Sequence, residues 1–65
     1  MARNLRRFRT ERGLTQEEVA ERAGLNRNYV GMIEREEHSP TIDVLERVAV
    51  VLDLDPHDLL RRDLP

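Results

Sequence analysis

The sequence of 65 residues contains no cysteine, no tryptophan and no lysine, and only one tyrosine and one phenylalanine. Without cysteine it can form neither a disulfide nor a thiolate metal site, and a small domain of this kind fits a reducing cytoplasm. No run approaches the roughly 18 apolar residues of a transmembrane helix. The charged N-terminus lacks the apolar stretch of a signal peptide. These absences predict a single cytoplasmic domain over 1–65, outside any membrane.

Residues that carry chemistry are also scarce. The two histidines, His38 and His57, come without cysteine and without paired carboxylates at ligand spacing, so we interpret them as exposed polar residues rather than metal ligands. Ser39 belongs to no evident nucleophile–base pair and is interpreted as part of a loop, and no phosphate-binding loop is present. We therefore expect neither an enzyme nor a bound metal or cofactor.

Charge is distributed unevenly along the chain, although the formal net charge is only −2. Residues 1–35 carry eight arginines against five acidic residues, which gives +3, and residues 36–65 carry three arginines against eight acidic residues, which gives −5. A basic half can face a polyanion while an acidic half faces away, because association depends on the local field. The acidic half is interpreted as a solvated face or, alternatively, as a docking surface for RNA polymerase.

Turn and cap signals divide the chain into five helices with no strand, which predicts a compact all-α bundle. The first helix is expected from Arg3 to Arg12, before a glycine. Thr15 opens the second with a capping box, T-Q-E-E. Asn26, Thr41 and Asp55 are expected to cap the other three. The apolar residues expected on the inner faces are Leu5, Phe8, Val19, Ala20, Ala23, Val30, Ile33, Leu45, Val48, Ala49 and Leu52.

The stretch 16–35, QEEVAERAGLNRNYVGMIER, predicts a helix-turn-helix. Ala20 is small enough for two steeply crossing helices, and Gly24 supplies the positive φ of a tight turn. With the inner positions filled by apolar residues, the outer face of the second helix is left for recognition. That outer face is Arg27, Asn28, Tyr29, Gly31 and Met32; the alternative is an ordinary solvated helix face.

Three segments together resemble the lambda-repressor/Cro-like family, also called the XRE family, over nearly the whole chain. The segments are LRRFRTERGLTQEEVAERAGL, NRNYVGMIERE and SPTIDVLERVAVVLDLDPHDLL. The run NRNYVGMIER also resembles the recognition helix of restriction–modification controller proteins. The resemblance implies a sequence-specific regulator that binds double-stranded DNA as a homodimer on a pseudo-palindromic operator.

The resemblance also implies roles for individual residues. Base contacts would come from Arg27, Asn28, Tyr29 and Met32, with arginine suited to guanine and asparagine to adenine. Phosphate contacts would come from Gln16, Asn26, Arg35 and His38. Arg9 and Glu34 match an arginine–glutamate pair that ties the recognition helix to the scaffold. The sequence departs from the family pattern in one loop, where Glu36-Glu37-His38 replaces a stretch that usually contains glycine.

Apolar residues in the last two helices exceed what one small core can absorb, which predicts a self-association surface. The expected dimer interface comprises Val51, Leu54, Pro56, Leu59, Leu60 and Leu64. The alternative is that Leu54, Leu59 and Leu60 close the bottom of the core. A second functional hypothesis is an antitoxin-like protein that binds a partner protein and autoregulates through DNA.

Overall fold

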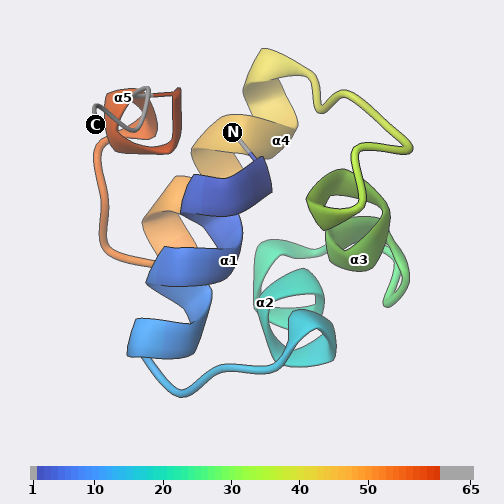
Figure 1. Cartoon of the computed structure of the whole chain (residues 1–65), viewed down its shortest axis with the longest axis horizontal. Helices are drawn as coiled ribbons and strands as arrows, with labels where there is room; N and C mark the ends of the chain where they lie inside the picture. The colour runs from blue at the N-terminus through green and yellow to red at the C-terminus, as the bar shows by residue number, and fades with distance from the viewer. Residues whose placement is uncertain (1, 61–65) are drawn as a thin grey trace.

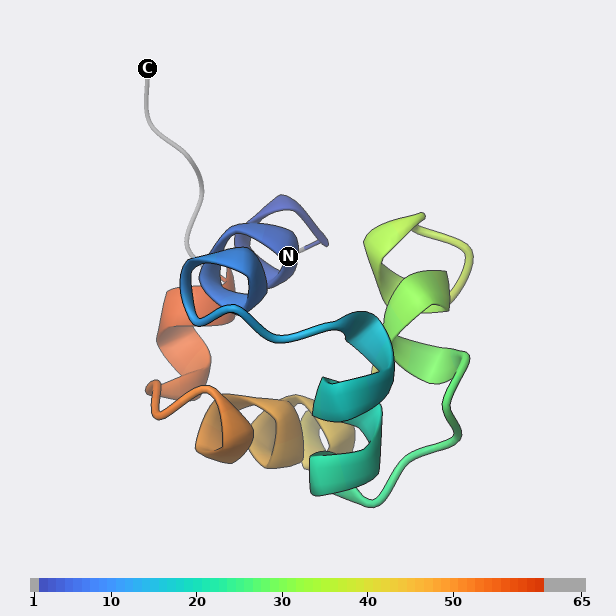
Figure 2. The same cartoon turned by 90° about the horizontal axis from the view of Figure 1, so that it is seen from below.

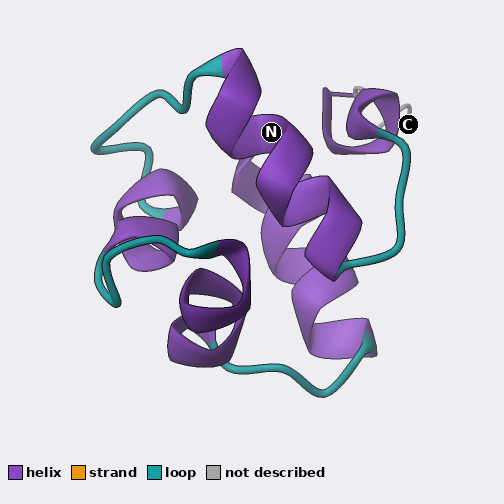
Figure 3. Ribbon diagram, turned by 180° about the vertical axis from the view of Figure 1, so that it is seen from behind, coloured by secondary structure: helices purple, strands orange, loops and turns teal. Residues whose placement is uncertain are grey.

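The computed structural model describes residues 2–60, and this part of the chain contains five helices and no strand (Figures 1 and 3). The helices are α1 (Ala2–Glu11), α2 (Gln16–Ala23), α3 (Tyr29–Glu34), α4 (Ile42–Val51) and α5 (Pro56–Leu60). The predicted all-α class is thus confirmed. None of the helices within 2–60 combines the length and the apolar character that spanning a bilayer requires.

Side-chain caps fix the start of three helices where the sequence predicts them. The Thr15 hydroxyl accepts a hydrogen bond from the Glu18 amide at 3.1 Å, and the Glu18 carboxylate accepts one from the Thr15 amide at 2.9 Å. These bonds complete a capping box, and they lower the pKa of Glu18. Thr41 caps α4 through the amide of Val44 at 3.2 Å, and Asp55 accepts from the amide of His57 at 2.9 Å.

All four connections between helices begin with the same Schellman turn, in which one left-handed residue follows the helix. Gly13 and Gly24 hold this position after α1 and α2, with φ of 67° and 71°. Glu36 and Asp53 hold it after α3 and α4, with φ of 59° and 56°. The loop after α3, which contains Glu36-Glu37-His38, therefore begins with the same left-handed turn as the connections after α1 and α2, with a glutamate under local strain.

The start of α3 differs from the prediction. The Asn26 side-chain oxygen accepts a hydrogen bond from the Asn28 amide at 2.9 Å, as a cap would, but the turn that this bond closes comes before the helix and does not open it. The helix begins at Tyr29, after Asn28 in the N-cap position with no side-chain cap. Arg27 consequently lies in the turn before α3 rather than in its first turn.

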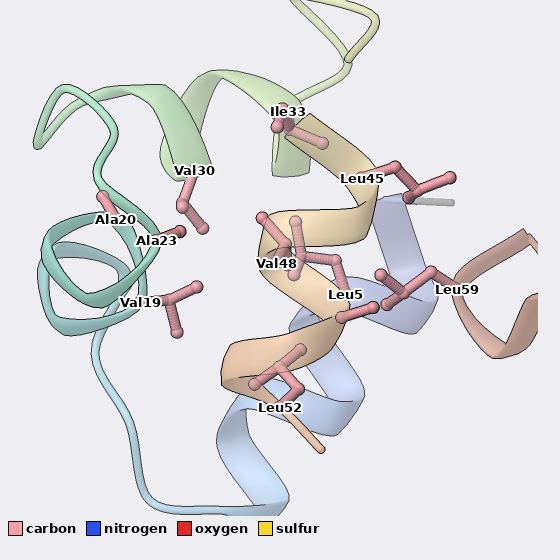
Figure 4. Packing of buried hydrophobic residues seen from close by; sticks show 11 residues of the cluster. Leu5, Val19, Ala20, Ala23, Val30, Ile33, Leu45, Val48, Leu52 and Leu59 are labelled. Carbon is pink, nitrogen blue, oxygen red and sulfur yellow. The ribbon is translucent and has the colours of Figure 1, made fainter. Parts of the chain in front are cut away.

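The core lies where α2 and α4 pack together and α1, α3 and α5 close around them. Figure 4 shows side chains of all five helices converging there. The buried apolar residues are Leu5, Val19, Ala20, Ala23, Val30, Ile33, Leu45, Val48, Ala49, Leu52 and Leu59. Every predicted inner residue is buried except Phe8, which packs partly buried against the cluster. In both Figure 1 and Figure 2, α3 and α5 lie at opposite ends of the domain.

Candidate nucleic-acid interface

A tight junction holds α2 against α3. Ala20 is fully buried, and Ala23 and Val30 lie beside it between the two helices (Figure 4). The left-handed Gly24 turns the chain, and the Leu25 amide donates to the carbonyl of Ala20 at 2.8 Å. The small side chain and the tight turn fix the orientation of α3 relative to α2, as the helix-turn-helix pattern predicts.

Arg9 and Glu34 form the predicted ion pair, and it is buried. The Arg9 guanidinium donates from Nε to Oε2 of Glu34 at 2.6 Å and from Nη2 to Oε1 at 3.0 Å. It also donates from Nη1 to the Leu14 carbonyl at 2.9 Å. The side chain of Glu34 is 0% exposed and that of Arg9 is 11% exposed. This pair ties α1 and the loop before α2 to the end of α3.

Two further side chains complete the surroundings of Glu34. Gln16 donates from Nε2 to Oε1 of Glu34 at 3.1 Å, and Arg6 approaches the same oxygen at 3.5 Å. Burial acts to raise the pKa of Glu34, but the hydrogen bonds from Arg9 and Gln16 and the nearby positive charges outweigh it and hold the pKa below its usual range. Glu34 is therefore a buried carboxylate that is ionised at neutral pH.

The residues predicted to contact bases lie in the turn before α3 and along its first residues. Arg27 and Asn28 are exposed, while Tyr29 and Met32 are half-buried. Arg27 reaches back to α2, with Nη2 3.4 Å from Oε1 of Glu17. This exposed pair was not foreseen from the sequence, because Glu17 lies on α2 and Arg27 lies ten residues later, in the turn before α3.

The residues predicted to contact phosphates lie at three places. Gln16 and Arg35 lie near one another, because both side-chain tips stand over Gly31. Asn26 is exposed in the turn before α3, where its side chain bonds the local backbone. His38 is exposed, with its ring edge-on to that of Tyr29 at a centroid distance of 4.9 Å.

Arg35 is held by Glu37 on the other side. The guanidinium donates from Nε to Oε2 of Glu37 at 3.1 Å and from Nη2 to Oε1 at 3.2 Å. These hydrogen bonds raise the pKa of Arg35. A phosphate that binds Arg35 would share the guanidinium with a carboxylate already in place, which gives the acidic loop a direct effect on the arginine beside it.

The residues predicted to form the dimer interface differ in how far they are exposed. Leu59 is 0% exposed within one chain, so its placement in the interface is wrong, and it closes the core as the alternative proposed. Leu60 is 55% exposed. Val51, Leu54 and Pro56 are half-buried, and Leu64 lies outside the described residues.

Two large apolar side chains that the sequence analysis did not single out are also exposed. Val50 is 78% exposed at the end of α4, and Ile42 is 75% exposed at its start. The buried residues of α4, Leu45, Val48 and Ala49, repeat with the helical period, and Ile42 and Val50 fall outside the stripe that they form. That period is the signal that could have placed both residues on the surface.

Comparison with known proteins agrees with this geometry. A family model described as helix-turn-helix matches residues 5–59. The transcriptional regulator SinR of Bacillus subtilis is 38% identical over 61 residues, which cover 92% of this chain and 55% of SinR. The control protein C.SmaI of Serratia marcescens is 39% identical over 62 residues, which cover 95% of this chain and 74% of C.SmaI.

Solved structures of such regulators are also similar to this chain. The restriction–modification controller protein C.AhdI from Aeromonas hydrophila superposes with a TM-score of 0.87 at 38% identity, over 89% of this chain and 88% of that one. SinR in complex with DNA superposes with a TM-score of 0.86 at 38% identity, over 92% of this chain and 97% of that one. The chain spans about half the length of full SinR and most of the controller protein.

Proposed function

This chain belongs to the lambda-repressor/Cro-like (XRE) family of helix-turn-helix transcriptional regulators, and from that membership we propose that it binds a pseudo-palindromic operator as a homodimer. The observation that carries the proposal is the fixed placement of α3, which Ala20 and Gly24 hold at its junction with α2 and the buried Arg9–Glu34 pair ties to α1. A helix held this rigidly can present side chains to base edges in a major groove. We propose a regulatory role without catalysis, as in this family.

Arg27 and Asn28 are the proposed base readers. Both are exposed at the N-terminal end of α3, which is the end of a recognition helix that contacts base edges. A guanidinium can donate two hydrogen bonds to guanine, and a side-chain amide can pair with adenine. Tyr29 and Met32 are half-buried, so we assign them the smaller role of apolar contacts with thymine methyl groups.

Gln16, Asn26, Arg35 and His38 are the proposed phosphate contacts. Gln16 adds its amide to the N-terminus of α2, where unpaired backbone amides favour an anion. Arg35 supplies a full positive charge at the other end of α3. Such contacts set the position of the protein on the duplex and add affinity for any sequence.

The dimer is proposed because one helix-turn-helix contacts few base pairs, which is too little to single out one site in a genome. Two recognition helices one turn of DNA apart, about 34 Å, double the contacts. Of the residues predicted for a two-fold contact, the exposed Leu60 and the half-buried Val51, Leu54 and Pro56 remain available. They lie at the end of α4, on the loop that follows and on α5, and α5 is at the opposite end of the domain from α3 (Figure 1).

RNA polymerase is proposed as a second partner. Exposed carboxylates follow residue 35 on the loops and along α4, among them Asp43, Glu46 and Asp53. Because these residues are not needed for the core, they are available to a basic protein surface while the basic half binds DNA. Transcription in a purified system would test this, since Glu46→Gln should change activation without changing operator affinity.

Selection of sites from a random duplex library tests the main proposal. We expect enrichment of a pseudo-palindrome whose half-sites are one helical turn apart. Titration of a labelled duplex carrying that site should then show a marked preference over scrambled DNA. Failure to enrich any sequence would overturn the proposal, and enrichment of a single unsymmetrical site would overturn the homodimer alone.

A further inference from the structure

We propose that Gly31 positions Gln16 and Arg35 for phosphate contact by leaving open the space that a side chain would fill. The inference rests on the proposed function and adds a residue that contacts no DNA itself. Gly31 lies in the interior of α3 and is buried, although the sequence places it on the outer face of the helix. Glycine weakens a helix interior relative to alanine, so its presence in so short a helix calls for a reason.

The side-chain tips of two residues provide that reason. A Cβ built on Gly31 would lie 3.0 Å from Oε1 of Gln16 and 3.0 Å from Nη1 of Arg35. Ordinary van der Waals contact with a Cβ begins at 3.4 Å. The two tips therefore occupy the space above the glycine, where one comes from the first residue of α2 and the other from the end of α3.

Each of the two tips is held in place by a neighbouring carboxylate. Gln16 donates to the buried carboxylate of Glu34 at 3.1 Å, and Glu34 is fixed in turn by Arg9. Arg35 is held on its far side by Glu37, in an exposed pair that gives way readily. A methyl group on Gly31 would push Gln16 against its bond to Glu34 and Arg35 toward the solvent.

The gap brings the side-chain amide of Gln16 and the guanidinium of Arg35 to one place, beside the N-terminus of α2. Gln16 uses one Nε2 hydrogen on Glu34, which leaves the second for an acceptor. Together with the charge of Arg35, this set suits a single phosphate of the DNA backbone. Gly31 is thus a positioning residue for affinity and not for base sequence.

A double-mutant cycle tests the inference. Gly31→Ala should weaken binding about 3- to 10-fold, the scale of one net hydrogen bond, and equally on the selected operator and on scrambled duplex. In the Gln16→Ala, Arg35→Ala background the same change should alter affinity by less than about twofold, because its targets are gone. The melting temperature of Gly31→Ala should stay at or above that of wild type, since alanine favours the helix.

The cycle remains informative if Gly31→Ala destabilises the fold. In that case Gln16→Ala should restore the melting temperature by removing the clash, and no restoration would overturn the proposed contact. An unchanged affinity, or an equal loss with and without Gln16 and Arg35, would overturn the inference while the proposed function stands. A wild type that binds no duplex at all would instead overturn the proposed function.

Discussion

Arg9 joins α1 to α3 through two hydrogen bonds to the buried Glu34 carboxylate, from Nε to Oε2 at 2.6 Å and from Nη2 to Oε1 at 3.0 Å. Loss of one partner leaves the other charge buried without compensation, which typically costs about 3–5 kcal/mol. We expect Arg9→Ala and Glu34→Ala each to reduce the free energy of unfolding by this order, and the double mutant to lose less than the sum. Denaturant titrations of all four proteins measure the coupling.

The exposed pair of Asp43 and Arg47 on α4 is a suitable control for that cycle. Its atoms approach to 3.2 Å, but both side chains are more than half exposed. Pairs of this kind contribute only about 0.3–0.5 kcal/mol. Coupling no greater for Arg9 and Glu34 than for Asp43 and Arg47 would show that burial adds nothing to the former pair.

The lowered pKa of Glu34 predicts a loss of stability in acid. Because its pKa lies lower in the folded chain than in the unfolded chain, the ionised group stabilises the fold above the unfolded value of about 4.3. That contribution disappears as the pH falls through the folded value. Comparing wild type with Glu34→Gln, we expect a constant difference in unfolding free energy between pH 5 and 7 that shrinks below about pH 4. A difference that grows in acid would contradict the assigned direction.

Arg27 should determine one base pair. Its guanidinium leaves an exposed contact with Glu17 to reach a guanine. Arg27→Ala should cost about 1–3 kcal/mol on the selected operator and relax the preference at one position. Competition binding against operators substituted at each position measures this. An equal loss on operator and scrambled duplex would assign Arg27 to the phosphate backbone instead.

Glu36 offers a stabilising substitution. Its φ of 59° is a left-handed conformation that costs a residue with a side chain about 1–2 kcal/mol, whereas glycine adopts it freely. Since the glutamate side chain is exposed, Glu36→Gly should raise the melting temperature. Gly24→Ala, at φ of 71°, is the matched opposite and should lower it. Equal melting temperatures for Glu36→Gly and wild type would mean that the turn stores no strain.

The sequence predicts the elements whose signals are local. The capping box at Thr15 and the cap at Thr41 need only residues three positions apart, and both form as expected. The start of α3 was misplaced because the predicted cap residue Asn26 does bond the Asn28 amide, but this bond closes a separate turn and the helix begins only at Tyr29.

Other features depend on the folded arrangement. Gln16 and Glu34 are 18 residues apart, so their hydrogen bond appears only when α2 packs against α3. The role of Gly31 follows from the same packing, since a glycine in sequence does not show what lies above it. The inner apolar positions were predictable because a helical period repeats over many residues, whereas a single pairing has no period.

Leu60 should be essential to the dimer. It is 55% exposed on α5, and a two-fold contact brings each such residue toward its copy or a neighbouring apolar group. Leu60→Glu places like charges there and should leave a folded monomer. Ile42→Glu adds the same charge to a residue that is even more exposed, at 75%, at the start of α4, and should stay dimeric. Sedimentation of the three proteins decides the matter. A wild type that stays monomeric with and without operator duplex rejects the dimer, and a folded dimeric Leu60→Glu relocates its interface away from α5.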